Sequence, residues 1–227
     1  MVAPSWPVMS SGGLAREAVD FAVASAVVAV VGLSLFLDVS KAFGLSALDA
    51  IAVCMTAFLA HDLAHKLCAR LLAGGGRFKL AVTGSLFSLL AAGLQHLMGV
   101  ATVALGFSTG EPIRLAPYRF LVPGTVVVRG RKKRETLGRI AMAGPAANVV
   151  LGWLMFFLGL SSPQLSEILL IGAAMSAYVA VTSLLPIAFC DGLTIYWWSR
   201  WAFVGTLAPS VALIAASNFV LLTSSWA

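Results

Sequence analysis

The chain has 227 residues, of which 60% are hydrophobic and only 11% are charged, and its mean hydropathy is +0.96. A soluble domain normally carries about 25% charged residues, so this composition excludes an ordinary soluble enzyme or binding module. It indicates an all-α polytopic protein of the cell membrane, in contact with the lipid bilayer. A single domain over residues 1–227 is enough to account for the length.

Five segments are apolar and about as long as the roughly 20 residues that a helix needs to cross a bilayer. In chain order they cover residues 18–37, 45–72, 138–158, 168–185 and 201–222. A further segment, residues 80–107, is apolar but interrupted by glycines and by Gln95 and His96. We therefore expect five to six transmembrane helices.

The basic residues suggest how these segments are oriented. Six of them gather in one short stretch: Arg129, Arg131, Lys132, Lys133, Arg134 and Arg139. Such a cluster can bind nucleic acid, but the cytoplasmic loops of membrane proteins are also rich in Lys and Arg. We expect a cytoplasmic loop and no nucleic-acid partner. With Arg70, Arg77 and Arg200 on the same side, the five segments alternate in direction across the membrane.

On this topology, segment 80–107 begins and ends on the cytoplasmic side. Its 28 residues are too few for two full helical crossings. The pattern predicts a re-entrant hairpin that turns between Gly93 and His96. The alternative is one ordinary sixth crossing with a different connection behind it.

Ionisable residues stand inside the second apolar segment, where they are costly and indicate a functional site. His61 and His65 are four residues apart, so they lie on one face of a helix, about one turn from each other. Two imidazoles placed in this way can bind one metal ion together. Asp62 would then lie close to an open position on that metal.

A catalytic metal site takes three protein ligands and leaves a fourth position for water. Asp191 is the best third candidate, because it is a lone acid behind the helix-breaking Pro186 and on the same predicted membrane side as the two histidines. Asp-Gly is also an ordinary turn pair, which is the alternative. His96 has no partner at a useful spacing, and we expect it to be neither a ligand nor catalytic.

Three short motifs occur in the order found in a known family. They are His61 to His65 (HDLAH), Ala143 to Asn148 (AGPAAN), and Asp191-Gly192 behind Pro186. Together they resemble the site-2 protease family of intramembrane zinc metalloproteases, and its compact archaeal members in particular. The resemblance implies Zn²⁺ held by His61, His65 and Asp191. It also implies hydrolysis of peptide bonds in or near the transmembrane helix of a protein substrate. The distribution of Lys and Arg places this active site nearer the cytoplasmic face.

The chain departs from the family pattern at three positions. Asp62 stands where the family has the catalytic Glu, and the shorter side chain moves the carboxylate by roughly 1 Å, which can cost on the order of 100-fold in rate. A slow or retuned protease, an inactive metal-binding relative and an engineered substitution all stay open. Ser183 replaces the family's Asn, and Phe189 stands where a second Pro is common.

Residues 121–129 contain a run of β-branched side chains behind Pro123-Gly124, which predicts a short strand on the cytoplasmic side. Its edge could hold an extended substrate as an added strand, or it could be a plain surface strand. Besides a protease, two other functions fit the sequence. One is a catalytically silent, metal-binding scaffold protein, and the other is a transporter that uses intramembrane His and Asp.

Overall fold

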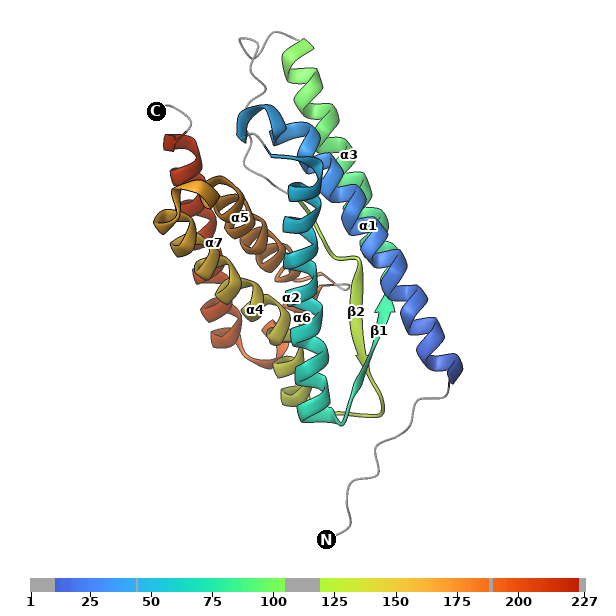
Figure 1. Ribbon diagram of the computed structural model, residues 1–227. Coiled ribbons are helices and arrows are strands. Elements are labelled where there is room, and N and C mark those ends of the chain that lie inside the picture. Colours follow the sequence, from blue (N-terminus) through green and yellow to red (C-terminus); the bar gives the residue numbers. More distant parts are fainter. Residues whose placement is uncertain (1–10, 44, 105–118, 188–189, 225–227) are drawn as a thin grey trace.

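The computed structural model of the protein describes residues 11–43, 45–104, 119–187 and 190–224. This part of the chain is mostly helical (Figure 1). Its elements, in order, are α1 (Ser11–Phe43), α2 (Ala47–Ala73), β1 (Gly76–Leu80), α3 (Val82–Ala104), β2 (Gly124–Val128), α4 (Arg134–Ser161), a 3-10 turn (Pro163–Leu165), α5 (Ser166–Ser183), α6 (Asp191–Trp198) and α7 (Arg200–Ser224).

The five predicted membrane spans are confirmed as helices. Within the described residues, α1, α2, α4, α5 and α7 are long and apolar enough to cross a membrane. The most enclosed of them is α5, whose residues 170–180 are all buried. It packs against α2, α4 and α7, and its Ile171 and Met175 share one apolar core with Phe58 of α2.

Local sequence signals set both ends of α2. At its start, the Ser46 side chain accepts a hydrogen bond from the Asp49 backbone N–H, and the Asp49 carboxylate accepts one from the Ser46 N–H. This reciprocal pair satisfies two backbone donors that a helix start leaves unpaired. At its end, Gly74 adopts a left-handed φ of 74°, which glycine reaches without strain and which stops the helix.

The predicted re-entrant hairpin is wrong. Residues 93–96 lie inside α3, which continues without a turn from Val82 to Ala104. One glycine costs a helix only about 1 kcal/mol, and an added side chain at Gly93 would meet nothing within 4 Å, so no close contact forces a turn there. The last three residues of the predicted hairpin, 105–107, lie outside the described residues.

The chain returns from α3 in an extended form. Residues 119–123 are buried and lead into β2. The Val122 backbone N–H donates to Ser88 Oγ (3.1 Å), and the Pro123 carbonyl accepts from the Ala81 N–H (3.0 Å). This segment therefore lies along the start of α3 and fixes where β2 begins.

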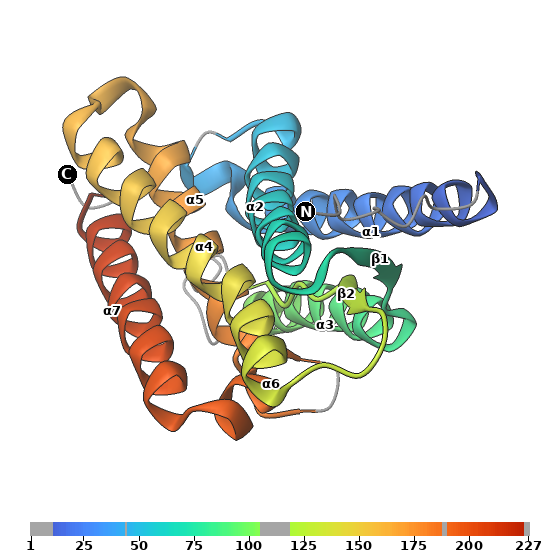
Figure 2. The ribbon, with the colours of Figure 1, turned by 90° about the horizontal axis from the view of Figure 1, so that it is seen from below.

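The predicted strand is confirmed as β2, and it has a partner strand that the sequence pattern did not indicate. β1 and β2 form a two-stranded antiparallel sheet in which Gly76 pairs with Val128 and Leu80 with Gly124. In both ribbon views β2 lies nearer to α6 than β1 does (Figures 1 and 2). Thr125 of β2 and Asp191, the first residue of α6, line one small cavity.

Candidate metal centre

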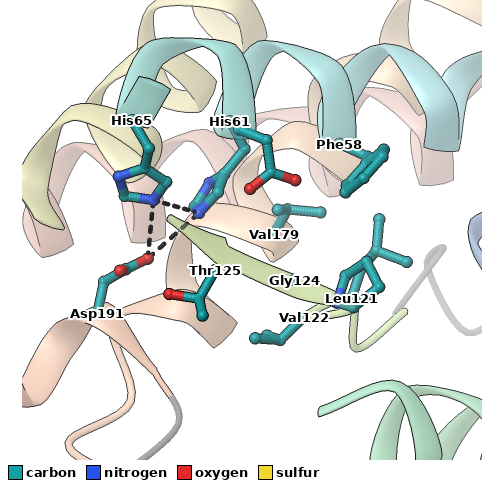
Figure 3. Close-up of a pocket in the computed structure, with 11 residues that line it drawn as sticks. Phe58, His61, His65, Leu121, Val122, Gly124, Thr125, Val179 and Asp191 are labelled. Atoms are coloured by element: carbon teal, nitrogen blue, oxygen red, sulfur yellow. Dashed lines mark hydrogen bonds and ion pairs between the residues drawn. The ribbon is translucent and has the colours of Figure 1, made fainter. Parts of the chain in front are cut away.

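Three of the predicted side chains meet at one point. His61 Nε2 and His65 Nε2 are 3.0 Å apart, and each lies 3.2 Å from the same oxygen, Oδ2 of Asp191. Figure 3 shows the two imidazoles descending from α2 toward the carboxylate, which comes from α6. Residues about 130 positions apart in the sequence therefore form one cluster, as the sequence predicted.

The spacing of these atoms fits a metal ion. Ligands at 2.0–2.1 Å from a tetrahedrally coordinated Zn²⁺ lie about 3.3 Å from one another, close to the three separations found here. All three groups are of the kinds that bind transition metals. The group formed by His61, His65 and Asp191 could therefore hold a metal ion; imidazole and carboxylate also suit metals other than zinc.

The backbone of α4 fixes the proton on His65. Its Nδ1 lies 2.7 Å from the Ile140 carbonyl oxygen, which can only accept a hydrogen bond. The Nδ1 atom must therefore carry the proton in the neutral ring, which leaves Nε2 with a free lone pair toward the cluster. Metal-binding histidines are commonly held in this way.

Asn148 of α4 orients the His61 ring, as the Ile140 carbonyl orients His65. The Asn148 Nδ2 atom lies 3.2 Å from His61 Nδ1, and Asn148 Oδ1 is buried without a hydrogen-bond partner among the described residues. The two ends of an amide are nearly indistinguishable in shape. With the amide turned over, Oδ1 accepts the proton of His61 Nδ1, and His61 Nε2 is free to bind a metal. The last residue of the AGPAAN motif thus supports a ligand.

The glycine of the same motif lets α4 approach the two histidines. A Cβ atom added at Gly144 would fall against His65 Nε2 and His61 Nε2. Any other residue at this position would occupy the space of the imidazoles. Pro145 follows inside α4 without ending the helix.

Asp191 is held by the turn between α5 and α6. The α5 helix ends at Ser183, and Asp191 is the first residue of α6. A Cβ atom at Gly192 would collide with the Leu184 backbone, so the glycine of the Asp-Gly pair permits this close turn. Burial alone would raise the pKa of the Asp191 carboxyl, but the neighbouring His65 and His61 imidazoles outweigh burial and hold that pKa well below its usual value.

A small cavity of about 20 Å³ lies beside the cluster. That is enough for about one water molecule, which needs roughly 10–15 Å³ on this measure. Four elements (α2, β2, α5 and α6) and the segment before β2 line it, with Phe58, His61, Asp62, His65, Leu121, Val122, Pro123, Gly124, Thr125, Val179 and Asp191. The segment from Leu121 to Thr125 covers one side (Figure 3).

Asp62 lies on this cavity but outside the metal-binding group. Its exposed fraction is 6%. Among the described residues it has no hydrogen-bond or ion-pair partner, although both neighbouring histidines do. A buried carboxylate without a protein partner is expensive. Water or a substrate in the cavity is the natural partner for it.

Ser183 does not lie on the cavity. Its hydroxyl donates to the Ala180 carbonyl of its own helix (2.9 Å), and the side chain is buried. It therefore cannot stand in for the amide that the family resemblance would place there. Phe189 lies outside the described residues, and His96 lies on α3, away from the metal-binding group.

Two features of the site were not predicted. The Ile140 carbonyl is a backbone atom, for which the sequence has no signal. Thr125 is the one hydroxyl-bearing residue among the described residues that line the cavity, and the sequence showed it only as part of a strand. Comparisons of the chain with protein-family models, with curated proteins and with solved structures found no match.

Proposed function

We propose that the protein is an intramembrane zinc metalloprotease that cleaves peptide bonds in or near the transmembrane segments of membrane proteins. One observation carries the proposal. Two imidazoles and a carboxylate converge to within 3.2 Å beside a second carboxylate, Asp62, on a helix apolar enough to span a membrane. Ionisable groups at membrane depth are costly, and such a cluster therefore indicates a functional site.

The protein supplies a place for the metal and a place for a proton. His61, His65 and Asp191 would hold the ion, and Asn148 and the Ile140 carbonyl would keep the rings in the required orientation. Bound zinc would lower the pKa of a neighbouring water to about 7 and polarise a peptide carbonyl. Asp62 would accept the proton of the attacking water and return it to the leaving amine.

The substrate would have to be extended at the scissile bond, because a helix hides its peptide groups. Within the described residues, β2 is paired on one edge only, with β1. An extended segment could add to its other edge by main-chain hydrogen bonds. The cavity of about 20 Å³ admits water but no peptide, so the covering segment from Leu121 to Thr125 would have to move aside for a substrate.

The predicted sidedness follows from charge. The end of α2 that carries His65 continues into Arg70, Arg77 and the basic loop before α4. By the positive-inside rule this end faces the cytoplasm. The active site would then lie nearer the cytoplasmic face.

Asp62 also supports a second candidate, a metal-binding relative that holds partner helices without cleaving them. Its side chain is one methylene shorter than that of Glu, and the cavity beside it is nearly closed. The metal site would then stabilise the fold, and no proton transfer would occur.

Cleavage of a single-span test protein by the purified chain in detergent micelles separates the two. The protease proposal predicts cleavage within or beside the span, mapped by mass spectrometry. Cleavage should be lost in Asp62→Asn and in His65→Ala and retained in His96→Ala. A chain that holds one metal ion and leaves a panel of such substrates intact would support the silent relative.

A further inference from the structure

A second concave site lies at the end of α2, apart from the metal centre. It is a groove of about 690 Å³, formed by the last three turns of α2, the glycine turn before β1 and the loop behind β2. We call it the α2 groove; its lining residues are Leu63, Lys66, Leu67, Arg70, Ala73, Gly74, Gly75, Gly76, Arg77, Arg129 and Lys132. None of them lines the metal cavity.

One wall of the groove is apolar and faces outward. Leu63 and Leu67 are four residues apart, so they lie on one face of α2, and each is 59% exposed. Because α2 is long and apolar enough to span a membrane, these leucines would face hydrocarbon in a bilayer. This wall suits an acyl chain.

The other wall is cationic. Lys66, Arg70, Arg77, Arg129 and Lys132 line it, and among the described residues no acidic side chain does. Two carboxylates of α1 reach this side, since Glu17 Oε1 lies 2.6 Å from Lys66 Nζ and Asp20 Oδ2 lies 3.9 Å from an Arg77 nitrogen. The loop behind β2 adds two more cations, Arg129 and Lys132, so positive charge gathers beside an apolar surface.

The groove therefore combines an apolar wall, which suits an acyl chain, with a cationic wall, which suits an anionic headgroup. We propose that it binds one anionic phospholipid of the surrounding bilayer, with the headgroup phosphate among Arg129, Lys132 and Arg77 and an acyl chain along Leu63 and Leu67. Basic pockets beside membrane helices bind such headgroups. A free phosphate would use the cations and ignore the leucines. The proposal does not rest on the protein being a protease.

The loop behind β2 offers a matched control. Arg129 and Lys132 line the groove, whereas the adjacent Arg131 and Lys133 are exposed and do not. The double variants Arg129→Gln/Lys132→Gln and Arg131→Gln/Lys133→Gln lose the same charge from the same segment. Diffuse attraction to an anionic surface predicts the same loss of lipid affinity in both double variants. A lipid bound in the α2 groove predicts a larger loss in Arg129→Gln/Lys132→Gln.

The test is native mass spectrometry of the full chain in neutral detergent, titrated with phosphatidylglycerol or with phosphatidylcholine of the same acyl chains. We expect one phosphatidylglycerol bound at least tenfold more tightly than phosphatidylcholine. Each basic residue near an anionic headgroup contributes about a factor of five. The groove variant should therefore bind about 25-fold more weakly, and the control variant less than threefold.

Two further measurements distinguish a bound lipid from a bound free phosphate. Leu67→Gln keeps every charge and should weaken phosphatidylglycerol binding, whereas millimolar inorganic phosphate should not displace the lipid. Equal loss in the two double variants, equal binding of the two lipids, or displacement by phosphate with no effect of Leu67→Gln would each overturn the proposal. All four loop positions are at least partly exposed, so we expect both double variants to fold. Circular dichroism of each variant checks this.

Discussion

Lengthening the Asp62 side chain by one methylene is the most informative change at the site. Asp62 follows His61 directly on α2, so it projects about 100° around the helix from it and flanks the metal-binding face. It lines the cavity without belonging to the metal-binding group. In Asp62→Glu the carboxylate advances by roughly 1 Å, and a misplacement of that size costs on the order of 100-fold. We expect the variant to cleave about 100-fold faster, which corresponds to about 2.7 kcal/mol of activation free energy.

The fold should tolerate this change. An extra methylene in a filled core costs about 1–3 kcal/mol, but Asp62 borders about 20 Å³ of open space. We therefore expect the free energy of unfolding to change by less than about 1 kcal/mol. Metal content should stay the same, because none of the three ligands is altered.

The assay compares initial cleavage rates of one single-span substrate by the unaltered chain, Asp62→Glu and Asp62→Asn, with the metal content of each preparation measured in parallel. Asp62→Asn should lose all residual cleavage, because an amide cannot accept the proton. If Asp62→Asn cleaves as fast as the unaltered chain, Asp62 is not the base. If Asp62→Glu binds metal fully and cleaves nothing, the protease proposal fails.

Three other changes test the metal centre. His65→Ala should reduce bound metal from about one ion per chain to near zero, whereas His96→Ala should leave it unchanged; equal loss from both would mean that the ligands are misassigned. Asn148→Leu should weaken metal affinity by about 10–100-fold, as is usual when a group that orients a ligand is removed, and Asn148→Asp, which keeps an acceptor for His61 Nδ1, should restore most of it. Unchanged affinity in Asn148→Leu would show that the amide does not hold the ring. Gly144→Ala should lower the free energy of unfolding by about 1–3 kcal/mol and release the metal, because its methyl group falls against both imidazoles; a variant of full stability and metal content would refute this packing.

The membrane helices and the cluster were predictable from the sequence for one reason, which is that each depends on a local pattern. A run of about 20 apolar residues can satisfy its backbone in a bilayer only as a helix. The HDLAH spacing places two imidazoles on one helix face whatever the rest of the fold does. Asp191 could be chosen because acids are rare in the apolar part of this chain.

One local prediction was wrong, and the features that the sequence did not indicate depend on contacts between distant segments. Gly93, Gln95 and His96 indicated a turn, but the chain forms one continuous helix there. A turn at membrane depth would leave backbone N–H and C=O groups without hydrogen bonds, which costs more free energy than keeping these residues in a helix. The partner strand β1 has five residues directly behind a glycine turn, and it is a strand because β2 pairs with it across more than 40 intervening residues. The roles of Asn148 and Gly144 became visible only when α4 was seen against α2.

X-ray absorption spectroscopy of the purified chain at the zinc edge tests the central claim most directly. The proposed function predicts one zinc ion per chain with two imidazole nitrogens at about 2.0–2.1 Å and carboxylate or water oxygens at about 2.0–2.2 Å, with no sulfur ligand. His61→Ala or Asp191→Ala should remove the signal. A sulfur contribution near 2.3 Å, or a full complement of zinc in Asp191→Ala, would contradict the proposed site.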